Sequence, residues 1–327
     1  MSLVSKRVLA TPYLASASEA CNEIFQRFGD KPISVREQLI DANQVQLLSL
    51  TLGRPNLHRG ISVTNTAPRT GTPIPPGYHL VYFTPTILEN DLGRDGTDRT
   101  VNPLSPFTRR MWAGGELEWK QGQDELLRVG QVVQEITRMR SVEPKKLKSG
   151  DEMLVVGVEK AYKTEKGVVL VDRRNWVFQK EIIDKTKQQS KPEPKALPEG
   201  NFTRDFLQTE VSLFRFSALT FNGHKIHYSR DWCREVEGHR DCVVHGPLNL
   251  INMLDLWRDT SRGAAEGAVP KRVAYRAMSP LYVGEQYRIL LEKEAAKEHM
   301  PGRECEGWKA EIWDFYGKVA LKGSIVE

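Results

Sequence analysis

The sequence predicts an α+β protein built from two similar units, each with a long helix wrapped by an antiparallel sheet. Three observations support this fold class. Residues 184–204 are rich in Lys, Pro and Gln, which is typical of a linker. The two flanking parts share an internal repeat. The second part also contains a segment that is apolar on most of its surface, which is typical of a buried helix. We therefore predict an N-terminal unit at 1–183 and a C-terminal unit at 205–327.

The repeat consists of a glycine-containing turn followed by strand-like residues. Leu127–Gln131 begins one alternating apolar stretch, and Gly167 follows 40 residues after Leu127. Leu281–Glu285 begins another, and Gly317 follows 36 residues after Leu281. Each later glycine would form the turn of a hairpin whose return strand follows at once. The agreement in order, type and spacing favours a duplicated unit.

In the C-terminal unit, the buried helix begins at Gly246-Pro247, because proline suits the first position of a helix. Leu248, Ile251 and Leu254 then recur at helical spacing. Strands are expected at 273–278, 281–293 and 308–326.

In the N-terminal unit, we expect the counterpart helix near residues 35–52, which contain many Leu, Ile and Val residues. Residues 53–108 are rich in Pro, Gly, Thr and Arg and predict long loops. Arg109–Trp119 resumes as a strand, with a bend at its pair of glycines.

Composition excludes some classes of function. The chain has 39% hydrophobic residues and no run of 18 apolar residues, so we expect no membrane-spanning segment. Lys145, Lys146 and Lys148 have no interleaved aromatic residues and match no nucleic-acid motif, so we expect no nucleic-acid partner. The net charge of +5 suits either an anionic substrate or ordinary solubility.

The cysteines and the N-terminal residues bear on location. The four cysteines form no C-x-x-C pair, which is typical of a reducing compartment, and we expect a cytoplasmic protein. Residues 1–18 contain Lys6, Arg7, several Ser and Ala and no acid, so a mitochondrial location stays open. A homodimer also stays open.

Residues 216–248 hold four of the seven histidines, namely His224, His227, His239 and His245. No cysteine or carboxylate provides a third ligand at a familiar zinc spacing, so we expect no metal. Cys233 and Cys242 lie near the histidines without a nucleophile motif around them. Acid–base chemistry by a histidine remains the favoured interpretation, with structural histidines as the alternative.

The start of the C-terminal helix offers a site for negative charge. The first N–H groups of a helix carry partial positive charge and have no partner one turn earlier. Gly246 would let a ligand approach this backbone closely. Such a site can hold a carbonyl oxygen as it becomes an oxyanion, although Gly-Pro can also serve only as a helix cap.

Phe216–Tyr228 and Val243–Leu248 together resemble the MaoC-like (R)-specific enoyl-thioester hydratase/dehydratase family. The similarity is greatest to the branch of hydroxyacyl-thioester dehydratase type 2 and mesaconyl-CoA hydratase. Tyr78–Pro85 and Arg109–Gly115 resemble the degenerate N-terminal unit of that branch. The resemblance implies a double hotdog fold and a hydro-lyase that adds or removes water at a 2-enoyl or 3-hydroxyacyl thioester. It implies no cofactor beyond the CoA or acyl-carrier pantetheine of the substrate.

The resemblance also assigns roles to three residues. His227 would transfer the proton, Asn222 would position water or hydroxyl, and the Gly246 N–H would stabilise the thioester enolate. Many family members have Asp where Asn222 stands, and an amide cannot exchange protons in this way. Further candidates for contact with the substrate are His224, His245, His79, Arg109, Arg110 and Trp112.

The N-terminal unit lacks counterparts of the acid–base residues. The repeat offset is 281 − 127 = 154, which places Pro68 and Pro73 opposite Asn222 and His227. One site is therefore expected for the whole chain. As an alternative, a repurposed hotdog enzyme would dehydrate, isomerise or cyclise an intermediate that is not a thioester.

Overall fold

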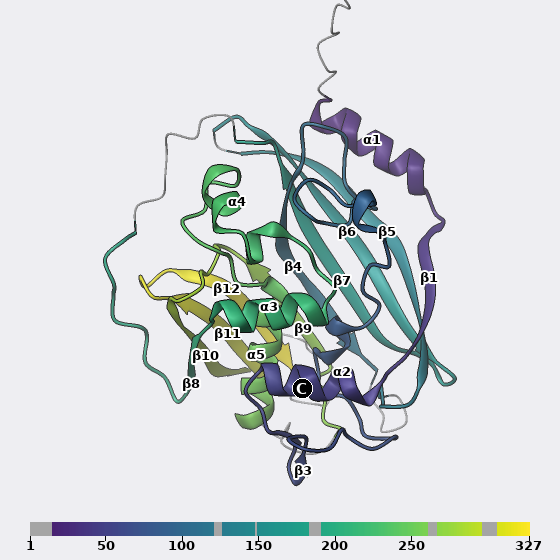
Figure 1. The fold of residues 1–327 in the computed structure, drawn as a ribbon, viewed down its shortest axis with the longest axis vertical. Coiled ribbons are helices and arrows are strands. Elements are labelled where there is room, and N and C mark those ends of the chain that lie inside the picture. Colours follow the sequence, from purple (N-terminus) through teal and green to yellow (C-terminus); the bar gives the residue numbers. More distant parts are fainter. Residues whose placement is uncertain (1–14, 121–125, 148, 183–190, 261–266, 296–305) are drawn as a thin grey trace, which may run out of the picture.

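The main feature of the computed structural model is one ten-stranded antiparallel sheet (Figure 1). The structure describes residues 15–120, 126–147, 149–182, 191–260, 267–295 and 306–327. The sheet consists of β1 (Pro32–Leu39), β4 (Arg109–Trp119), β5 (Val132–Lys146), β6 (Glu152–Thr164), β7 (Gly167–Gln179), β8 (Phe202–Leu207), β9 (Arg272–Ala277), β10 (Gln286–Ala295), β11 (Glu306–Asp314) and β12 (Val319–Val326).

A separate small sheet and several helices complete the described part of the chain. The small sheet pairs β2 (Asn56–His58) with β3 (Ile61–Ser62). The helices are α1 (Ala17–Phe28), α2 (Ala42–Thr51), α3 (Glu210–Leu219), α4 (Arg230–Glu235) and α5 (Gly246–Thr260), with short 3-10 helices η1 (Tyr78–Val81), η2 (Glu89–Asp91) and η4 (Lys225–His227).

The strand order is symmetric about the centre of the large sheet. It runs β1-β5-β6-β7-β4-β9-β12-β11-β10-β8, so each strand of the first half has a counterpart in the second. β5 begins at residue 132 and β10 at residue 286, and 286 − 132 = 154 is the offset of the sequence repeat. The predicted α+β fold with a duplicated unit is therefore confirmed. We call β1, β5, β6, β7 and β4 the N-terminal half-sheet and the other strands the C-terminal half-sheet.

The two halves differ in their helices, and here one prediction was wrong. Residues 35–39, expected in a helix, belong to β1, which pairs with β5 as an edge strand. Helix α2 begins only after this strand. The side chain of Asp41 caps its start by accepting a hydrogen bond from Gln44 N–H at 2.8 Å. Because α2 follows β1 as α3 follows β8, α2 corresponds to α3 and packs against it. Residues 53–108, all of them described, contain no counterpart of the long helix α5.

Helix α5 forms the centre of the core. Every side chain from Leu248 to Arg258 is buried, as its apolar pattern predicts. The side chains of Ile289, Leu291 and Ile312 belong to the same core cluster. The turn at Gly77 lies against this helix as well, since a Cβ there would be 3.1 Å from Leu254 Cδ1. Loops of the N-terminal half thus help to bury the helix of the C-terminal half.

The central strand β4 confirms the predicted bend. Its pairing with β7 shifts register between Trp112 and Gly114. Gly114 has a φ of 138°, and a Cβ there would lie 2.3 Å from Tyr275 O. Glycine is therefore needed for β4 to fit between β7 and β9. The predicted hairpin turns at Gly167 and Gly317 are also present, and both glycines have positive φ.

The strand expected at 281–293 begins later than predicted, because β10 starts at Gln286. The preceding residues bond to the segment before α5 instead: Val244 N–H donates to Leu281 O at 2.8 Å and Val283 N–H donates to Cys242 O at 3.0 Å. These bonds hold the start of α5 against the turn before β10.

Some sequence predictions concern regions that the structure describes only in part. The predicted linker at 184–204 overlaps undescribed residues 184–190, and β8 already begins at Phe202, so its boundaries stay a prediction. Most of the N-terminal stretch that bears on location also lies outside the described residues. Within the described part, no helix is long and apolar enough to span a membrane.

Candidate active site

One cavity of about 1240 Å³ is lined by residues of both halves of the molecule. Segments that line it include β4, the residues between α3 and η4, and the start of α5. This volume can hold most of a small-molecule substrate. The predicted site residues on its wall are Asn222, His224, His227, His245, Gly246, Arg110 and Trp112.

His227 lies at the end of η4 and is buried. Its Nδ1 is 2.8 Å from Val243 O. Since a carbonyl oxygen can only accept, Nδ1 must carry the hydrogen and Nε2 the lone pair. Burial, together with the neighbouring His239 and Arg110, lowers the pKa of His227 to about 4, although the hydrogen bond to Val243 O opposes this. At neutral pH this imidazole is therefore an uncharged base, and no described residue bonds to its Nε2.

His245 supports His227 from behind. The two rings stack with centroids 3.5 Å apart and planes 17° apart. His245 Nε2 is 2.9 Å from Ser217 Oγ on α3, and burial lowers the pKa of His245 well below its usual value. Two neutral rings can stack closely, whereas two imidazolium ions would repel. The stacking thus fixes the plane of His227.

Asn222 is placed by an unusual turn after α3. Phe221 has a φ of 47°, and the Asn222 N–H donates to Ser217 O at 2.8 Å. Asn222 Oδ1 then accepts from His224 N–H at 3.1 Å. The side-chain NH₂ makes no hydrogen bond to a described residue, so it can donate to an oxygen atom in the cavity.

His224 lies beside His227, with ring centroids 5.4 Å apart in an edge-on arrangement. Its Nε2 is 3.7 Å from Asp95 Oδ2, which is longer than a hydrogen bond. Burial is the main cause that lowers the pKa of His224 well below its usual value, and electrostatic interaction with His227 and Arg110 lowers it further. It is therefore a second neutral ring on the same wall.

Gly246 is the first residue of α5, and its N–H has no carbonyl one turn earlier to bond. The helix entrance is also packed against Trp112: a Cβ at residue 246 would lie 2.8 Å from Trp112 Cδ1. Glycine is thus required for the packing of this indole as well as for access to the backbone.

The structure divides the predicted N-terminal site residues into two groups. Arg110 and Trp112 line the cavity, and Arg110 donates to Asp98 O at 3.0 Å. Arg109 lies off the cavity wall and donates to Glu237 Oε2 at 2.9 Å, which ties β4 to the segment after α4. His79 is likewise off the wall, with Nε2 3.4 Å from Asp172 Oδ2.

The sequence interpretation missed several cavity residues. Charged and aromatic side chains of the N-terminal half-sheet reach the wall, and α5 contributes Asn249, whose buried Oδ1 has no partner among the described residues. The alternation of the strands carried a signal, because charged residues recur there at inward positions. The missed sheet residues include Arg36, Thr137, Lys160, Arg174 and Trp176.

The sequence around His58 and His299 indicates no function and predicts surface positions for both. His58 is instead buried, with Nε2 2.8 Å from Pro73 O. His299 lies outside the described residues. Among the residues that the structure describes, no group of three or more His, Cys, Asp or Glu side chains is arranged to hold a metal ion.

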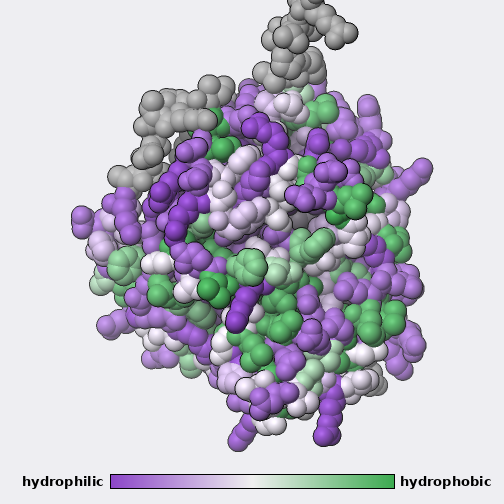
Figure 2. Space-filling model, viewed as in Figure 1, coloured by the Kyte–Doolittle hydropathy of each residue, from purple (hydrophilic) through white to green (hydrophobic). Residues whose placement is uncertain are grey.

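The cavity mouth is partly apolar. Phe214 on α3 and Phe221 line the cavity, yet they are 68% and 66% exposed. Figure 2 shows hydrophobic side chains gathered over α3 and α2 on this face of the molecule. The mouth can therefore contact an apolar part of a substrate that extends outside the cavity.

Comparison with known proteins shows the family. Residues 77–283 match the family model of hydroxyacyl-thioester dehydratase type 2. The chain is 30% identical to mesaconyl-C(4)-CoA hydratase of Chloroflexus aurantiacus, over 68% of this chain and 76% of the relative. It is 25% identical to the mitochondrial hydroxyacyl-thioester dehydratase type 2 of Schizosaccharomyces pombe, over 68% and 79%.

Solved structures confirm the double hotdog fold. A MaoC-like dehydratase from Phytophthora capsici aligns with a TM-score of 0.62 at 12% identity, over 95% of this chain and 98% of that one. A Mycobacterium tuberculosis protein with a double hotdog fold aligns with a TM-score of 0.52 at 13% identity, over 90% and 95%. The chain belongs to the hydroxyacyl-thioester dehydratase type 2 family.

Proposed function

We propose that this chain adds water to a 2-enoyl thioester or removes it from a 3-hydroxyacyl thioester, with His227 as the acid–base group. The observation that carries the proposal is the bond from His227 Nδ1 to Val243 O at 2.8 Å. It leaves the basic Nε2 of a neutral imidazole for the cavity, whose wall also includes Gly246 at the start of α5. Family membership supports the hydro-lyase class.

In the hydration direction, the thioester carbonyl accepts a hydrogen bond from Gly246 N–H. His227 Nε2 removes a proton from water while the water oxygen forms a bond to C3 of the enoyl group. The electrons of the C2=C3 bond move toward the carbonyl, and the partial positive charge at the start of α5 stabilises the resulting enolate oxygen. The imidazolium then returns its proton to C2, and dehydration is the reverse.

Asn222 would hold the reacting oxygen. Its Oδ1 is engaged with His224 N–H, which orients the amide and leaves the NH₂ as donor. A donor at this position can bind a lone pair of water or of the 3-hydroxyl, while His227 handles its proton. Asn222 thus needs no proton exchange of its own.

The apolar mouth supports a thioester carried on pantetheine. Phe214 and Phe221 are exposed at the rim of the cavity. The pantetheine arm of CoA or of an acyl-carrier protein could pass these rings while the acyl group enters the cavity. The same arm brings the thioester, so the site needs no cofactor for the step described above.

The test follows the loss of the conjugated thioester absorbance with 2-enoyl-CoA substrates. His227→Ala should lower kcat/KM by about 10³-fold, because general acid–base groups contribute roughly 10²–10⁴. His58→Ala is the matched control, since His58 is also buried but lies off the cavity wall. No turnover by folded wild-type protein, or full activity of His227→Ala, would overturn the proposal.

A further inference from the structure

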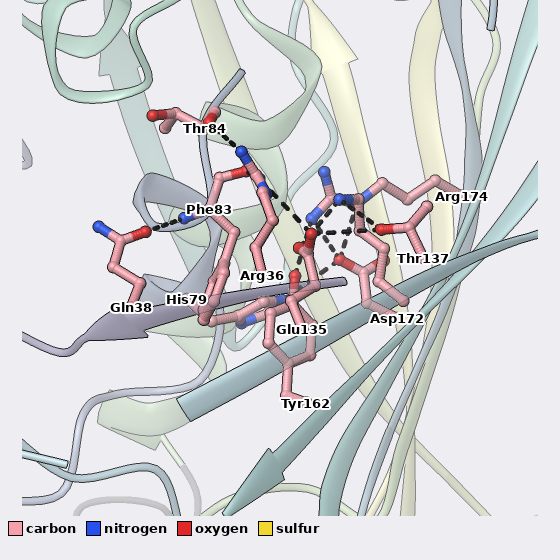
Figure 3. A network of polar contacts seen from close by, with 11 residues as sticks. Arg36, Gln38, His79, Phe83, Thr84, Glu135, Thr137, Tyr162, Asp172 and Arg174 are labelled. Atoms are coloured by element: carbon pink, nitrogen blue, oxygen red, sulfur yellow. Dashed lines mark hydrogen bonds and ion pairs between the residues drawn. The ribbon is translucent and has the colours of Figure 1, made fainter. Parts of the chain in front are cut away.

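The inner face of the N-terminal half-sheet carries a group of charged side chains, which we call the polar row (Figure 3): its carboxylates are buried and its cations are partly buried. Strand register places its members side by side. Arg36 on β1 pairs with Glu135 on β5. Thr137 on β5 pairs with Lys160 on β6, and Lys160 pairs with Asp172 on β7. The polar row consists of Arg36, Glu135, Thr137, Lys160, Asp172 and Arg174.

Each carboxylate of the polar row is held by cations. Glu135 accepts from Lys160 Nζ at 2.9 Å and lies 3.5 Å from Arg36 Nη2. Asp172 accepts from Arg174 Nε at 2.7 Å. Although burial opposes it, Arg174 and then the neighbouring His79 lower the pKa of Asp172, so this group is a carboxylate at neutral pH. Both carboxylates are at most 1% exposed.

The polar row has an excess of positive charge. Its three cations and two carboxylates leave a net charge of +1. His79 adds nothing at neutral pH, because burial lowers its pKa. An excess charge in a largely buried place is less well solvated than one at the surface, so an anion beside it is favourable. The polar row is therefore one negative charge short of balance.

The cations, and not the carboxylates, face the cavity. Arg36, Lys160 and Arg174 line it, together with Thr137, while Glu135 and Asp172 lie behind them. Arg174 uses Nε and Nη2 for Asp172, and its Nη1 bonds to no described residue. Two other carboxylates line the cavity, namely Glu89 and Asp98. Glu89 interacts electrostatically with Tyr228, and Asp98 interacts electrostatically with Arg110. Neither carboxylate belongs to the polar row.

The polar row lies close to the proposed chemistry. Trp112 packs on the backbone of Gly246, and the Arg174 guanidinium carbon is 5.6 Å from the centre of the same indole. Only one aromatic ring thus separates the proposed oxyanion site from Arg174 of the polar row. A short acyl chain can span this distance, whereas a long apolar chain would have to bury its methylenes against charged groups.

We propose that the polar row binds a carboxylate at the far end of the acyl group. The preferred substrate is then a short enoyl or hydroxyacyl thioester that ends in a carboxylate, that is, the monothioester of a dicarboxylic acid. This inference rests on the proposed function for the thioester end of the substrate. Recognition of the anion itself depends only on the polar row and can be measured separately.

The experiment compares two 2-enoyl-CoA substrates of equal chain length, one ending in a carboxylate and the other in its methyl ester. Wild-type protein should prefer the carboxylate in kcat/KM by at least about tenfold, as charge-assisted hydrogen bonds are strong. Lys160→Gln lowers the net charge of the polar row to zero and should remove most of this preference. Glu135→Gln raises the charge and should keep or increase it.

The double variant Glu135→Gln/Lys160→Gln is the matched control. It restores the net charge of +1 while both side chains remain altered, so the preference should return toward the wild-type value. If the preference depended on undisturbed packing and not on net charge, the double variant would have the weakest preference for the carboxylate substrate of all the variants. That result, or equal use of both substrates by wild-type protein, would overturn the inference.

A binding measurement separates this inference from the proposed function. Calorimetry with monomethyl glutarate, whose ester stands in for the thioester, and with dimethyl glutarate needs no turnover. We expect the monoanion to bind wild-type protein at least about tenfold more tightly than the uncharged diester, and Lys160→Gln to lose this difference. Such binding without any hydration activity would contradict the proposed function alone. Hydration without any carboxylate preference in either assay would contradict the polar-row inference alone.

Discussion

The two inner faces of the large sheet have opposite characters. The C-terminal half-sheet presents apolar side chains, such as Ile289 and Ile312, to the core around α5. The N-terminal half-sheet presents the polar row to the cavity, and residues 53–108 supply no long helix there. The same strand order thus serves packing on one side and recognition on the other. A covering helix demands apolar partners, whereas a cavity tolerates charges.

The largest expected effect concerns the packed half. Leu254→Ala on α5 removes a fully buried side chain and should lower the free energy of unfolding by about 3–4 kcal/mol. Val158→Ala on β6, next to the cavity, should cost only about 1 kcal/mol, because part of its surroundings is already open. Urea denaturation measures both variants. Equal costs would show that the two faces are packed alike.

The next effect lies where the two halves meet. Gly246→Ala brings a Cβ within 2.8 Å of Trp112 Cδ1, so the indole must move. We expect kcat/KM to fall about 10²-fold, as when an oxyanion donor is misplaced. Adding Trp112→Leu should recover part of this loss by removing the clash. If the double variant is no better than Gly246→Ala, the effect does not come from Trp112.

A smaller effect concerns the pH dependence of the free energy of unfolding, which we expect to arise from the histidines of the C-terminal half. The cavity wall from the C-terminal part holds His224, His227, His239 and His245, and burial is the main cause that lowers the pKa of each. The unfolded chain binds protons near pH 6.5, while folded His227 and His239 do so only at about 4. Stability is therefore complete above pH 6.5 and is lost as the pH falls, by about 1.4 kcal/mol per pH unit for each histidine.

Urea denaturation at pH 7, 6 and 5 measures this dependence, in a range above the titration of most carboxylates. His239→Gln removes one titrating group and should make the slope shallower by about 1.4 kcal/mol per pH unit below pH 6.5. Val158→Ala, which removes no titratable group, should leave the slope unchanged. A slope that does not change in His239→Gln would show that this histidine is not held neutral by the fold.

The smallest effect is expected for charges on the N-terminal half-sheet that are open to solvent. Arg173, a neighbour of Arg174 on β7, bonds to Glu116, Glu118 and Glu159. Because these partners are partly exposed, Arg173→Ala should change the free energy of unfolding by less than about 1 kcal/mol. Arg174→Ala should cost more, since it leaves Asp172 buried without its main partner. Thermal unfolding of the two variants gives the comparison.

The sequence predicted the parts that depend on local pattern. Helix α5 begins at Gly246 as its Gly-Pro start indicates, and β4 spans the predicted Arg109–Trp119. The wrong helix at 35–39 shows where pattern fails. Val35 and Leu39 fit a helical spacing of four, yet they lie on an exposed edge strand because β5 offers backbone partners. The secondary structure of residues 35–39 was thus determined by pairing with a strand far away in the sequence.

For the candidate site, too, the sequence indicated the residues that lie close together in the chain and missed those that only the sheet brings together. Asn222, His227 and Gly246 lie within one short stretch of sequence, so a local motif could bring them together. The polar row comes from four strands between residues 32 and 179, and its members share a face only once the register is known. His79 and Arg109 were candidates because their side chains can bind a substrate. They instead interact with Asp172 and Glu237 and do not line the cavity.

The pairing of β4 with β9 has a consequence for how the site responds to dilution. These strands join the two halves within one polypeptide, and the cavity takes its lining from both. The half without acid–base residues is therefore always present in equal amount beside the half that has them, at an effective concentration that does not depend on how much protein is in solution. Covalent linkage of the two halves turns a bimolecular assembly step into a property of folding, so dilution should not separate the two walls of the cavity.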